Sequence, residues 1–259
     1  MAFLHASFFS PVLQKEVGLN AIVPETGRGP FPVFYLLHGL SDDYTIWHRR
    51  TRIEWYVRKL PLIVVMPDGY RGFYTDNHDG AAYGRYLVED VIGFAERTFP
   101  AIGKRAARCI GGLSMGGYGA MRTALAHPEL FVSAHSHSGA LFDLSKPFRP
   151  ERRAMLKKIY GPKAKGSAHD IFHLAAHHKR RGTRLPKLWI DCGLDDHLIA
   201  NNRAFHAHLE KLGVAHHYAE HPGVHDWDYW EKHIVAALAF HAKALGLDSG
   251  EGIKRLGGG

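Results

Sequence analysis

The five residues from Gly112 to Gly116 carry the clearest chemical signal in the sequence. They read Gly-Leu-Ser-Met-Gly, which places Ser114 between two glycines at the spacing of a nucleophile elbow. A strand-like run enters this pentapeptide at residues 108–111, and a helix-forming run leaves it at residues 119–126. A sharp turn from strand to helix exposes the serine hydroxyl beside a helix N-terminus, where developing negative charge is favoured. The pattern therefore predicts that Ser114 is a nucleophile.

A serine hydroxyl is a weak nucleophile, so it needs a base within hydrogen-bond reach. The chain has 20 histidines, and most of them must be surface or packing residues. His225 differs in its position, because it lies in a loop with Pro and Gly between the last predicted strand and the last predicted helix. We therefore predict that His225 is the base, with His221 as the competing residue.

An acidic residue must orient such a base and stabilise the imidazolium that forms. In serine hydrolases built on a mainly parallel sheet, the acid falls between the serine and the histidine along the chain. Asp195 and Asp196 both satisfy this order after the strand-like run 187–192, and the pattern alone does not separate them. Asp226 is less suited, because it directly follows His225 and can cap the last helix instead.

The oxyanion of a tetrahedral intermediate needs hydrogen-bond donors, and backbone N–H groups often supply them. The N–H of Met115, directly after the serine, is one predicted donor. The N–H of Leu40 is the other, since an early strand-like run ends there and Gly39 lets the backbone approach the site. The side chains of Leu40 and Met115 then take no part in the chemistry. We interpret His38 as a structural residue bonded to nearby loops.

Short apolar runs predict the buried strands that must position these groups. They cover residues 32–37, 62–66, 108–112, 131–135, 187–192 and, with a more polar pattern, 215–220. Runs with helical spacing of apolar residues alternate with them, at residues 44–60, 83–99, 116–126, 201–212 and 229–245. This alternation predicts an α/β fold with a mainly parallel central sheet and helices on both faces.

Residues 141–185 interrupt the alternation with prolines, glycines and two short helical patches. We predict a lid-like insertion over the carboxyl edge of the sheet, where ligands bind in open α/β sheets. The insertion is basic, because residues 146–187 carry 13 Lys or Arg against two acidic residues. We interpret this charge as a solvated surface, with attraction of acidic ligands as the alternative. The prediction is one domain over residues 1–247 and a mobile tail over residues 248–259.

The composition of the 259-residue chain excludes several classes of protein. Hydrophobic residues make up 46% and charged residues 22%, so disordered and fibrous architectures are excluded. No run reaches the roughly 18 apolar residues of a membrane span. Cys109 and Cys192 lie in strand-like runs and indicate buried thiols in a reducing compartment. Residues 1–16 do not have the pattern of a signal peptide, so we expect a cytoplasmic protein.

The sequence predicts neither a metal site nor a cofactor. Histidines occur in pairs without the spacing of a designed metal site, as in His135 with His137, His206 with His208, His177 with His178 and His216 with His217. The glycine-rich segment 111–117 lacks the lysine of a phosphate-binding loop. Four tryptophans are expected in the core or a pocket wall: Trp47, Trp55, Trp227 and Trp230.

Longer segments around these residues match a known family pattern almost end to end. They include YLLHGL (35–40), WHRRT (47–51), VVMPDG (64–69), FYTD (73–76), GGLSMGGYGA (111–120), CGLDD (192–196) and GVHDWDYW (223–230). With them the chain resembles the putative esterase family of α/β-hydrolases, and within it the bacterial tributyrin-type esterases. S-formylglutathione hydrolases, feruloyl esterases and mycolyltransferases are related. The resemblance implies Ser114 as nucleophile, His225 as base and Asp196 as acid, with Leu40 and Met115 at the oxyanion positions.

These features predict a serine carboxylesterase that hydrolyses short-chain or carbohydrate-linked acyl esters through an acyl-enzyme. One alternative is acyl transfer to a sugar or alcohol, and another is a thioesterase of the S-formylglutathione type. The segment 38–42 differs from that branch, which has a cysteine nearby. A binding module with a relic triad is a third, non-enzymatic alternative. The expected partner is a small-molecule ester, not nucleic acid or a membrane, and the sequence leaves a homo-oligomer open.

Overall fold

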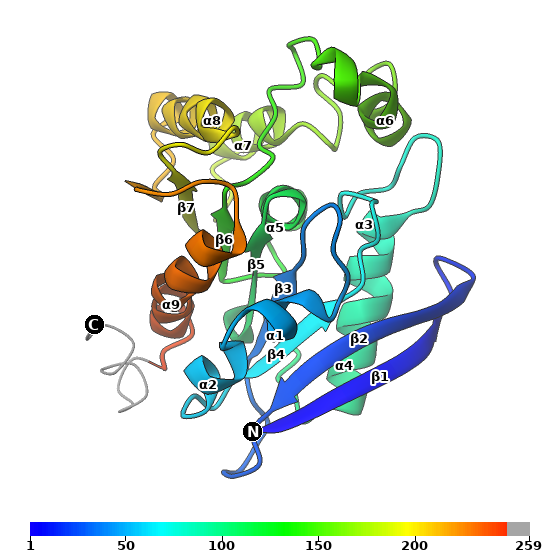
Figure 1. The fold of residues 1–259 in the computed structure, drawn as a ribbon, viewed down its shortest axis with the longest axis vertical. Coiled ribbons are helices and arrows are strands. Elements are labelled where there is room, and N and C mark those ends of the chain that lie inside the picture. The colour runs from blue at the N-terminus through cyan, green and yellow to red at the C-terminus, as the bar shows by residue number, and fades with distance from the viewer. Residues whose placement is uncertain (248–259) are drawn as a thin grey trace.

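An eight-stranded sheet forms the centre of the molecule (Figure 1). The computed structural model describes residues 1–247, so the predicted tail at 248–259 lies outside the described residues. The strands follow the order β1-β2-β4-β3-β5-β6-β7-β8. Their bounds are β1 (Ala2–Ser10), β2 (Lys15–Val23), β3 (Val33–Leu37), β4 (Ile63–Pro67), β5 (Arg108–Leu113), β6 (Ser133–His137), β7 (Lys187–Gly193) and β8 (His217–His221). β2 pairs antiparallel with β1 and β4, and all other pairs are parallel. The predicted α/β class is confirmed.

Helices cover both faces of the sheet because the central strands present apolar side chains on both sides. In β3, Tyr35 and Leu37 belong to one buried layer, whereas Phe34 and Leu36 belong to the other. The first layer is covered by α4 (Ile92–Thr98), α5 (Met115–Ala126), α7 (Ile171–Arg180) and α8 (Ile199–Leu212). The second is covered by α1 (Ile46–Arg50), α2 (Ile53–Val57) and α9 (Trp227–Ala244). A short helix, α3 (Tyr83–Arg85), continues through a π-helical turn (Tyr86–Val91) into α4.

The N-terminal hairpin of β1 and β2 was not among the predicted strands. β1 lies at the edge of the sheet, and most of its residues are exposed or half-buried. Its sequence, AFLHASFFS, mixes apolar and polar residues, so it forms no apolar run of the kind that marks the central strands. Nine residues of each strand nevertheless pair in continuous register, from Ala2 with Val23 to Ser10 with Lys15.

The single helix predicted over residues 44–60 is wrong, because α1 and α2 are separate. Thr51 adopts an extended conformation between them, with φ −135° and ψ 166°. Its hydroxyl donates to the carbonyl of Trp47 (2.6 Å) and accepts the N–H of Ile53 (3.2 Å), which stabilises the break. Of the two places expected for Trp55, the core is excluded: its side chain is 59% exposed, with the guanidinium of Arg58 over its ring, and it lines a surface cavity with His48.

β6 reads Ser-Ala-His-Ser-His, yet all five residues are buried. The predicted range 131–135 therefore ends two residues early, because the apolar run precedes the polar strand. Internal hydrogen bonds stabilise both histidines, because polar groups are costly to bury without partners. His135 Nδ1 lies 2.7 Å from His241 Nε2 of α9, and the Nδ1–H of His137 donates to Asp191 Oδ2 at 2.7 Å. Both histidines of β6 therefore serve as core residues.

The insertion contains the two predicted helical patches, α6 (Pro150–Tyr160) and α7. α6 lies beyond the carboxyl ends of the strands, at the top of Figure 1. Leu156, Ile159 and Ala175 of the insertion join the same buried cluster as α5 and the sheet. The hydroxyl of Tyr118 on α5 also donates to the carbonyl of His169 at 2.8 Å. Within residues 1–247, no helix combines the length and the apolar character needed to cross a bilayer.

Candidate active site

Ser114 stands at the turn between β5 and α5, with φ +52° and ψ −114°. The neighbouring glycines are needed because the end of β3 passes very close to this turn. A Cβ atom on Gly112 or on Gly116 would lie 2.5 Å from the carbonyl oxygen of Leu37. The N–H of Ser114 donates to the carbonyl of His137 at the end of β6 (2.9 Å), which holds the strained turn in place. The structure therefore has the backbone geometry of a nucleophile elbow.

His225 and Asp196 form a chain of hydrogen bonds that ends at Ser114. His225 Nε2 lies 3.0 Å from Ser114 Oγ, and His225 Nδ1 lies 2.8 Å from Asp196 Oδ2. The carboxylate accepts the Nδ1–H, so Nε2 is left as the acceptor for the serine hydroxyl. Asp196 is only 2% exposed, and its second oxygen accepts the N–H of Leu198 at 2.7 Å. The imidazole is therefore oriented to remove the serine proton.

The ionised form of Asp196 is stabilised by its neighbours. Burial alone would raise the pKa of this carboxyl group. The hydrogen bond and the charge of His225 act in the opposite direction, together with the N–H of Leu198, and the net effect is a pKa below the usual value. A carboxylate that stays ionised in this position can stabilise an imidazolium on His225.

The competing residues do not reach Ser114 in this structure. Asp195 is exposed, and its N–H donates to the carbonyl of Gly223 at 3.0 Å. Asp226 caps α9, where its Oδ1 accepts the N–H of Tyr229 at 3.0 Å. The ring of His221 stacks on that of His233, with centroids 4.3 Å apart. The structure thus brings Asp196 and His225, and neither of their sequence neighbours, to the serine.

Of the two backbone groups expected to bind an oxyanion, one belongs to the elbow and the other to the loop after β3. Met115 is the first residue of α5, so its N–H has no acceptor within the helix. Leu40 follows the end of β3, which packs against the start of α5 through the close approach at Gly116. The N–H of Gly39 is already bonded to Asp42 Oδ2 at 3.2 Å. The next N–H along this loop is that of Leu40.

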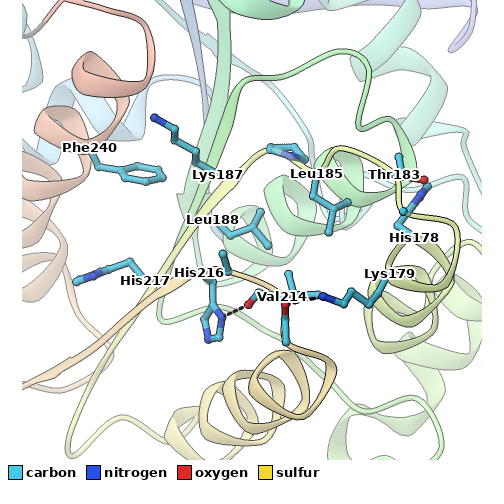
Figure 2. Close-up of a pocket in the computed structure, with 14 residues that line it drawn as sticks. His178, Lys179, Thr183, Leu185, Lys187, Leu188, Val214, His216, His217 and Phe240 are labelled. Atoms are coloured by element: carbon cyan, nitrogen blue, oxygen red, sulfur yellow. Dashed lines mark hydrogen bonds between the residues drawn. The ribbon is translucent and has the colours of Figure 1, made fainter.

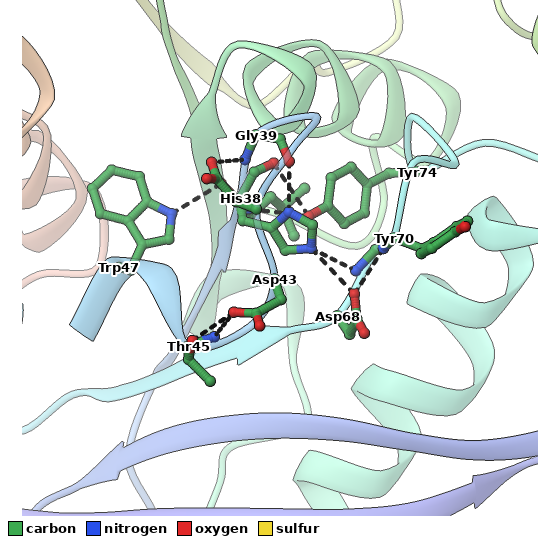
Figure 3. A network of polar contacts seen from close by, with 11 residues as sticks. His38, Gly39, Asp43, Thr45, Trp47, Asp68, Tyr70 and Tyr74 are labelled. Carbon is green, nitrogen blue, oxygen red and sulfur yellow. Dashed lines mark hydrogen bonds and ion pairs between the residues drawn. The ribbon is translucent and has the colours of Figure 1, made fainter. Parts of the chain in front are cut away.

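A buried network around His38 fixes the loop that carries Leu40 (Figure 3). The N–H of Gly69 donates to His38 Nε2 (2.8 Å), so Nδ1 carries the proton and donates to the carbonyl of Gly39 (2.8 Å). The backbone N–H of His38 donates to the hydroxyl of Tyr74 at 3.0 Å. His38 thus connects two loops and is not in contact with Ser114. No sequence pattern indicated this role for Tyr74, and its backbone φ of +51° is a feature that sequence spacing does not reveal.

A cavity of about 680 Å³ lies away from these residues (Figure 2). Lys187 and Leu188 at the start of β7 line it, together with His216 and His217 at the start of β8. Parallel strands place their starts and ends at opposite edges of the sheet, and Ser114 follows the end of β5. This cavity is therefore at the edge opposite to the hydrogen-bonded residues.

One group of three possible metal ligands occurs among the described residues, formed by Asp196, His197 and His225. Two of the three are already hydrogen-bonded to each other, and His225 also bonds to Ser114. A metal ion here would compete with the contact between imidazole and hydroxyl. The donor set therefore fits proton transfer from Ser114 better than it fits a resident metal ion.

An α/β sheet with a serine at a strained elbow, bonded through histidine to a buried aspartate, defines a serine hydrolase of the α/β-hydrolase fold. Comparison with known proteins narrows this class. The family model described as putative esterase matches residues 10–241, so the chain belongs to that family. The family predicted from the sequence is confirmed.

Individual relatives agree with this assignment. An acetyl esterase of Caldicellulosiruptor saccharolyticus is 31% identical over 263 residues, covering 94% of this chain and 99% of the relative. The fluorophosphonate-binding serine hydrolase FphF of Staphylococcus aureus superposes with a TM-score of 0.83 at 30% identity, covering 92% of this chain and 97% of that one. An S-formylglutathione hydrolase of Staphylococcus aureus superposes with a TM-score of 0.82 at 30% identity, covering 92% and 98%. The chain is a carboxylic ester hydrolase of the serine type.

Proposed function

We propose that Ser114 is the nucleophile, His225 the general base and acid, and Asp196 the orienting acid of this esterase. The single observation that carries the proposal is the continuous chain from Ser114 Oγ through His225 to Asp196, with contacts of 3.0 and 2.8 Å. These distances are within the range in which proton transfer and orientation operate. The N–H groups of Leu40 and Met115 are the proposed oxyanion donors.

The reaction proceeds in two halves. His225 Nε2 takes the Ser114 proton as Oγ attacks the ester carbonyl, and the N–H groups of Leu40 and Met115 stabilise the oxyanion. Collapse of this intermediate breaks the bond to the alcohol, which leaves with the proton from His225. A water molecule then gives a proton to His225 and attacks the acyl-enzyme. Collapse of the second intermediate breaks the bond between the acyl carbon and Ser114 Oγ, His225 returns its proton to Oγ, and the carboxylic acid leaves.

The substrates we propose are short acyl esters, including acetyl esters and acyl groups linked to carbohydrate. Support comes from the relative named acetyl esterase, which aligns over 94% of this chain. The elbow and the family resemblance of the sequence indicate the same class of substrate. A panel of p-nitrophenyl esters of increasing acyl length, with sugar acetates and aromatic-acyl esters beside them, measures this preference through kcat/KM.

The proposed mechanism is tested with p-nitrophenyl acetate and the variant Ser114→Ala. Removal of the nucleophile should lower kcat by about 10⁶-fold and abolish labelling by a fluorophosphonate. Ser7→Ala is the matched control, because Ser7 is an exposed serine on β1. A pre-steady-state burst of p-nitrophenol should accompany the acyl-enzyme in the parent protein and in Ser7→Ala. Full turnover by Ser114→Ala would show that another group performs the chemistry.

A thioesterase is the second candidate, because a relative at 30% identity is named S-formylglutathione hydrolase. Comparing kcat/KM for S-formylglutathione with that for p-nitrophenyl acetate separates the two activities on the same residues.

Product analysis with added alcohols or sugars tests acyl transfer, since a transferase would yield the new ester instead of the free acid. Binding of polyanions without any ester turnover would favour a non-enzymatic module.

We also propose that the protein works in the cytoplasm. Cys109 and Cys192 are both free and buried, with no disulfide between them. Buried free thiols are typical of proteins from reducing compartments. Fractionation of the source cells, with detection of the esterase by a fluorophosphonate probe, tests this location.

A further inference from the structure

A cavity of about 290 Å³ lies between the insertion and the start of α8. Two chain segments that leave the proposed active site line it. Phe142 and Asp143 follow Ala140, whose N–H donates to the carbonyl of Ser114 at 2.9 Å. His197 and its successor Leu198 directly follow Asp196 in the acid loop. The cavity therefore begins within a few residues of both the nucleophile and the acid.

His197 forms the wall shared by this cavity and the reacting groups. Its ring meets that of His225 edge to face, with centroids 4.5 Å apart. On the cavity side, the Arg152 guanidinium donates to His197 Nε2 at 3.4 Å. A substrate group in the cavity is thus separated from the proposed base by one imidazole ring.

The cavity is lined by apolar side chains and by three cations, which we call the rim cations. The apolar side chains are buried or half-buried, among them Phe142, Phe148, Leu156 and Leu198. The rim cations come from the basic insertion: Lys146, Arg149 and Arg152. This lining combines side chains suited to a short hydrocarbon segment with cations suited to an anion.

The three rim cations differ in how much charge they leave available. Lys146 lies 3.7 Å from the carboxylate of Asp143, which offsets its charge. Neither Arg149 nor Arg152 has a carboxylate oxygen within 4.0 Å among the described residues. Both arginines lie at the first turn of α6, where the helix N-terminus adds positive potential. Their guanidinium groups remain able to bind an anion.

The positive charges of Arg149 and Arg152 help to lower the pKa of His197. Burial lowers the pKa of His197, the charge of His225 lowers it further, and both Arg152 and Arg149 add to the effect. Asp196 acts in the opposite direction but does not reverse it. The positive potential of the rim cations therefore extends to the ring that packs against His225.

We propose that this cavity binds an anionic group of the ester, so that the enzyme prefers esters with a carboxylate over matched neutral esters. Arg149 and Arg152 are the proposed specificity residues, because guanidinium groups bind carboxylates through paired, charge-assisted hydrogen bonds. The inference rests on the proposed function, since the anion matters only if the ester carbonyl reaches Ser114. It also gives a role to two cations of the insertion that the esterase mechanism leaves unused.

Two matched pairs of esters test the preference. In the first pair, mono-p-nitrophenyl adipate carries a carboxylate on the acyl group, and its methyl ester is neutral there. p-Acetoxybenzoate and its methyl ester do the same on the alcohol side. We expect kcat/KM to favour the carboxylate by about tenfold or more in one of the pairs, mainly through KM. High salt should reduce this ratio, because it screens the charges of the rim cations.

The double variant Arg149→Gln/Arg152→Gln should remove the preference and leave turnover of the neutral esters unchanged. Arg181→Gln is the control, since Arg181 is an exposed cation of the same insertion that does not line this cavity. The inference is overturned if neither pair shows a preference for the carboxylate, or if the preference survives the double substitution. In either case, turnover of the neutral esters would still support the proposed function. Failure to hydrolyse any neutral ester through Ser114 would instead refute the proposed function, and this inference with it.

Discussion

Replacing Asp196 by Asn puts an NH₂ group in place of one carboxylate oxygen and keeps the shape of the side chain. The native carboxylate accepts two hydrogen bonds, from the His225 Nδ1–H at 2.8 Å and from the Leu198 N–H at 2.7 Å. Asparagine has one acceptor oxygen and one donor NH₂ group. If the oxygen keeps the Leu198 N–H, the NH₂ group faces His225 Nδ1.

That arrangement reverses the role of the imidazole. Nδ1 must then accept, so the proton moves to Nε2, the atom that lies 3.0 Å from Ser114 Oγ. An Nε2–H cannot remove the serine proton. In a serine protease with the same relay, such a tautomer change lowers kcat by about 10⁴-fold. We expect Asp196→Asn to lose a similar factor, about 5 kcal/mol in the activation barrier.

The assay is the kcat for p-nitrophenyl acetate at neutral pH, with circular dichroism to verify folding. Asp195→Asn is the matched control, because Asp195 is the exposed neighbour and bonds through its backbone N–H only to the loop of Gly223. It should retain most of the activity. Equal losses in the two variants, or an Asp196→Asn enzyme within about tenfold of the parent, would refute the tautomer argument.

Two further predictions concern the buried polar groups. Burial lowers the pKa of His241 to about 3 and that of His233 to about 4, whereas a histidine in an unfolded chain has a pKa of about 6.5. Below about pH 6.5 the unfolded state therefore binds more protons than the folded state. As the pH is lowered from there, the free energy of unfolding should decrease by up to about 1.4 kcal/mol per pH unit for each histidine. Urea unfolding at a series of pH values measures this, and a flat profile there would contradict it. Tyr74→Phe removes the acceptor of the His38 N–H, so it should cost about 1–3 kcal/mol of stability. It should also lower kcat several-fold by loosening the loop of the proposed oxyanion donor, whereas Tyr70→Phe, at an exposed tyrosine of the neighbouring loop, should do neither.

The sequence predicted the parts of the fold that depend on local pattern. The glycines around Ser114 indicated a close backbone approach, and the structure shows the carbonyl of Leu37 where a side chain on Gly112 or Gly116 would have to lie. The apolar runs of the central strands also marked buried positions directly. Such signals are visible because a close backbone approach requires glycine and a strand buried on both faces requires apolar side chains.

Features that depend on distant partners could not be predicted in the same way. β6 is polar in sequence and becomes a core strand only because α9 and β7 supply hydrogen-bond partners. The choice between Asp195 and Asp196 depends on the direction of two neighbouring side chains, which local spacing does not encode. The role of Tyr74 arises from a contact across 36 residues of chain.

The acid and base loops are tied to each other by backbone hydrogen bonds. The N–H of Leu194 donates to the carbonyl of His221 (2.8 Å), and that of Asp195 donates to Gly223 (3.0 Å). Neither bond involves α6 or the rest of the insertion. The bonds that hold the acid loop against the base loop are therefore independent of the helix that carries the proposed specificity residues. A grafted insertion from a relative could bring a new substrate range to the same reacting atoms.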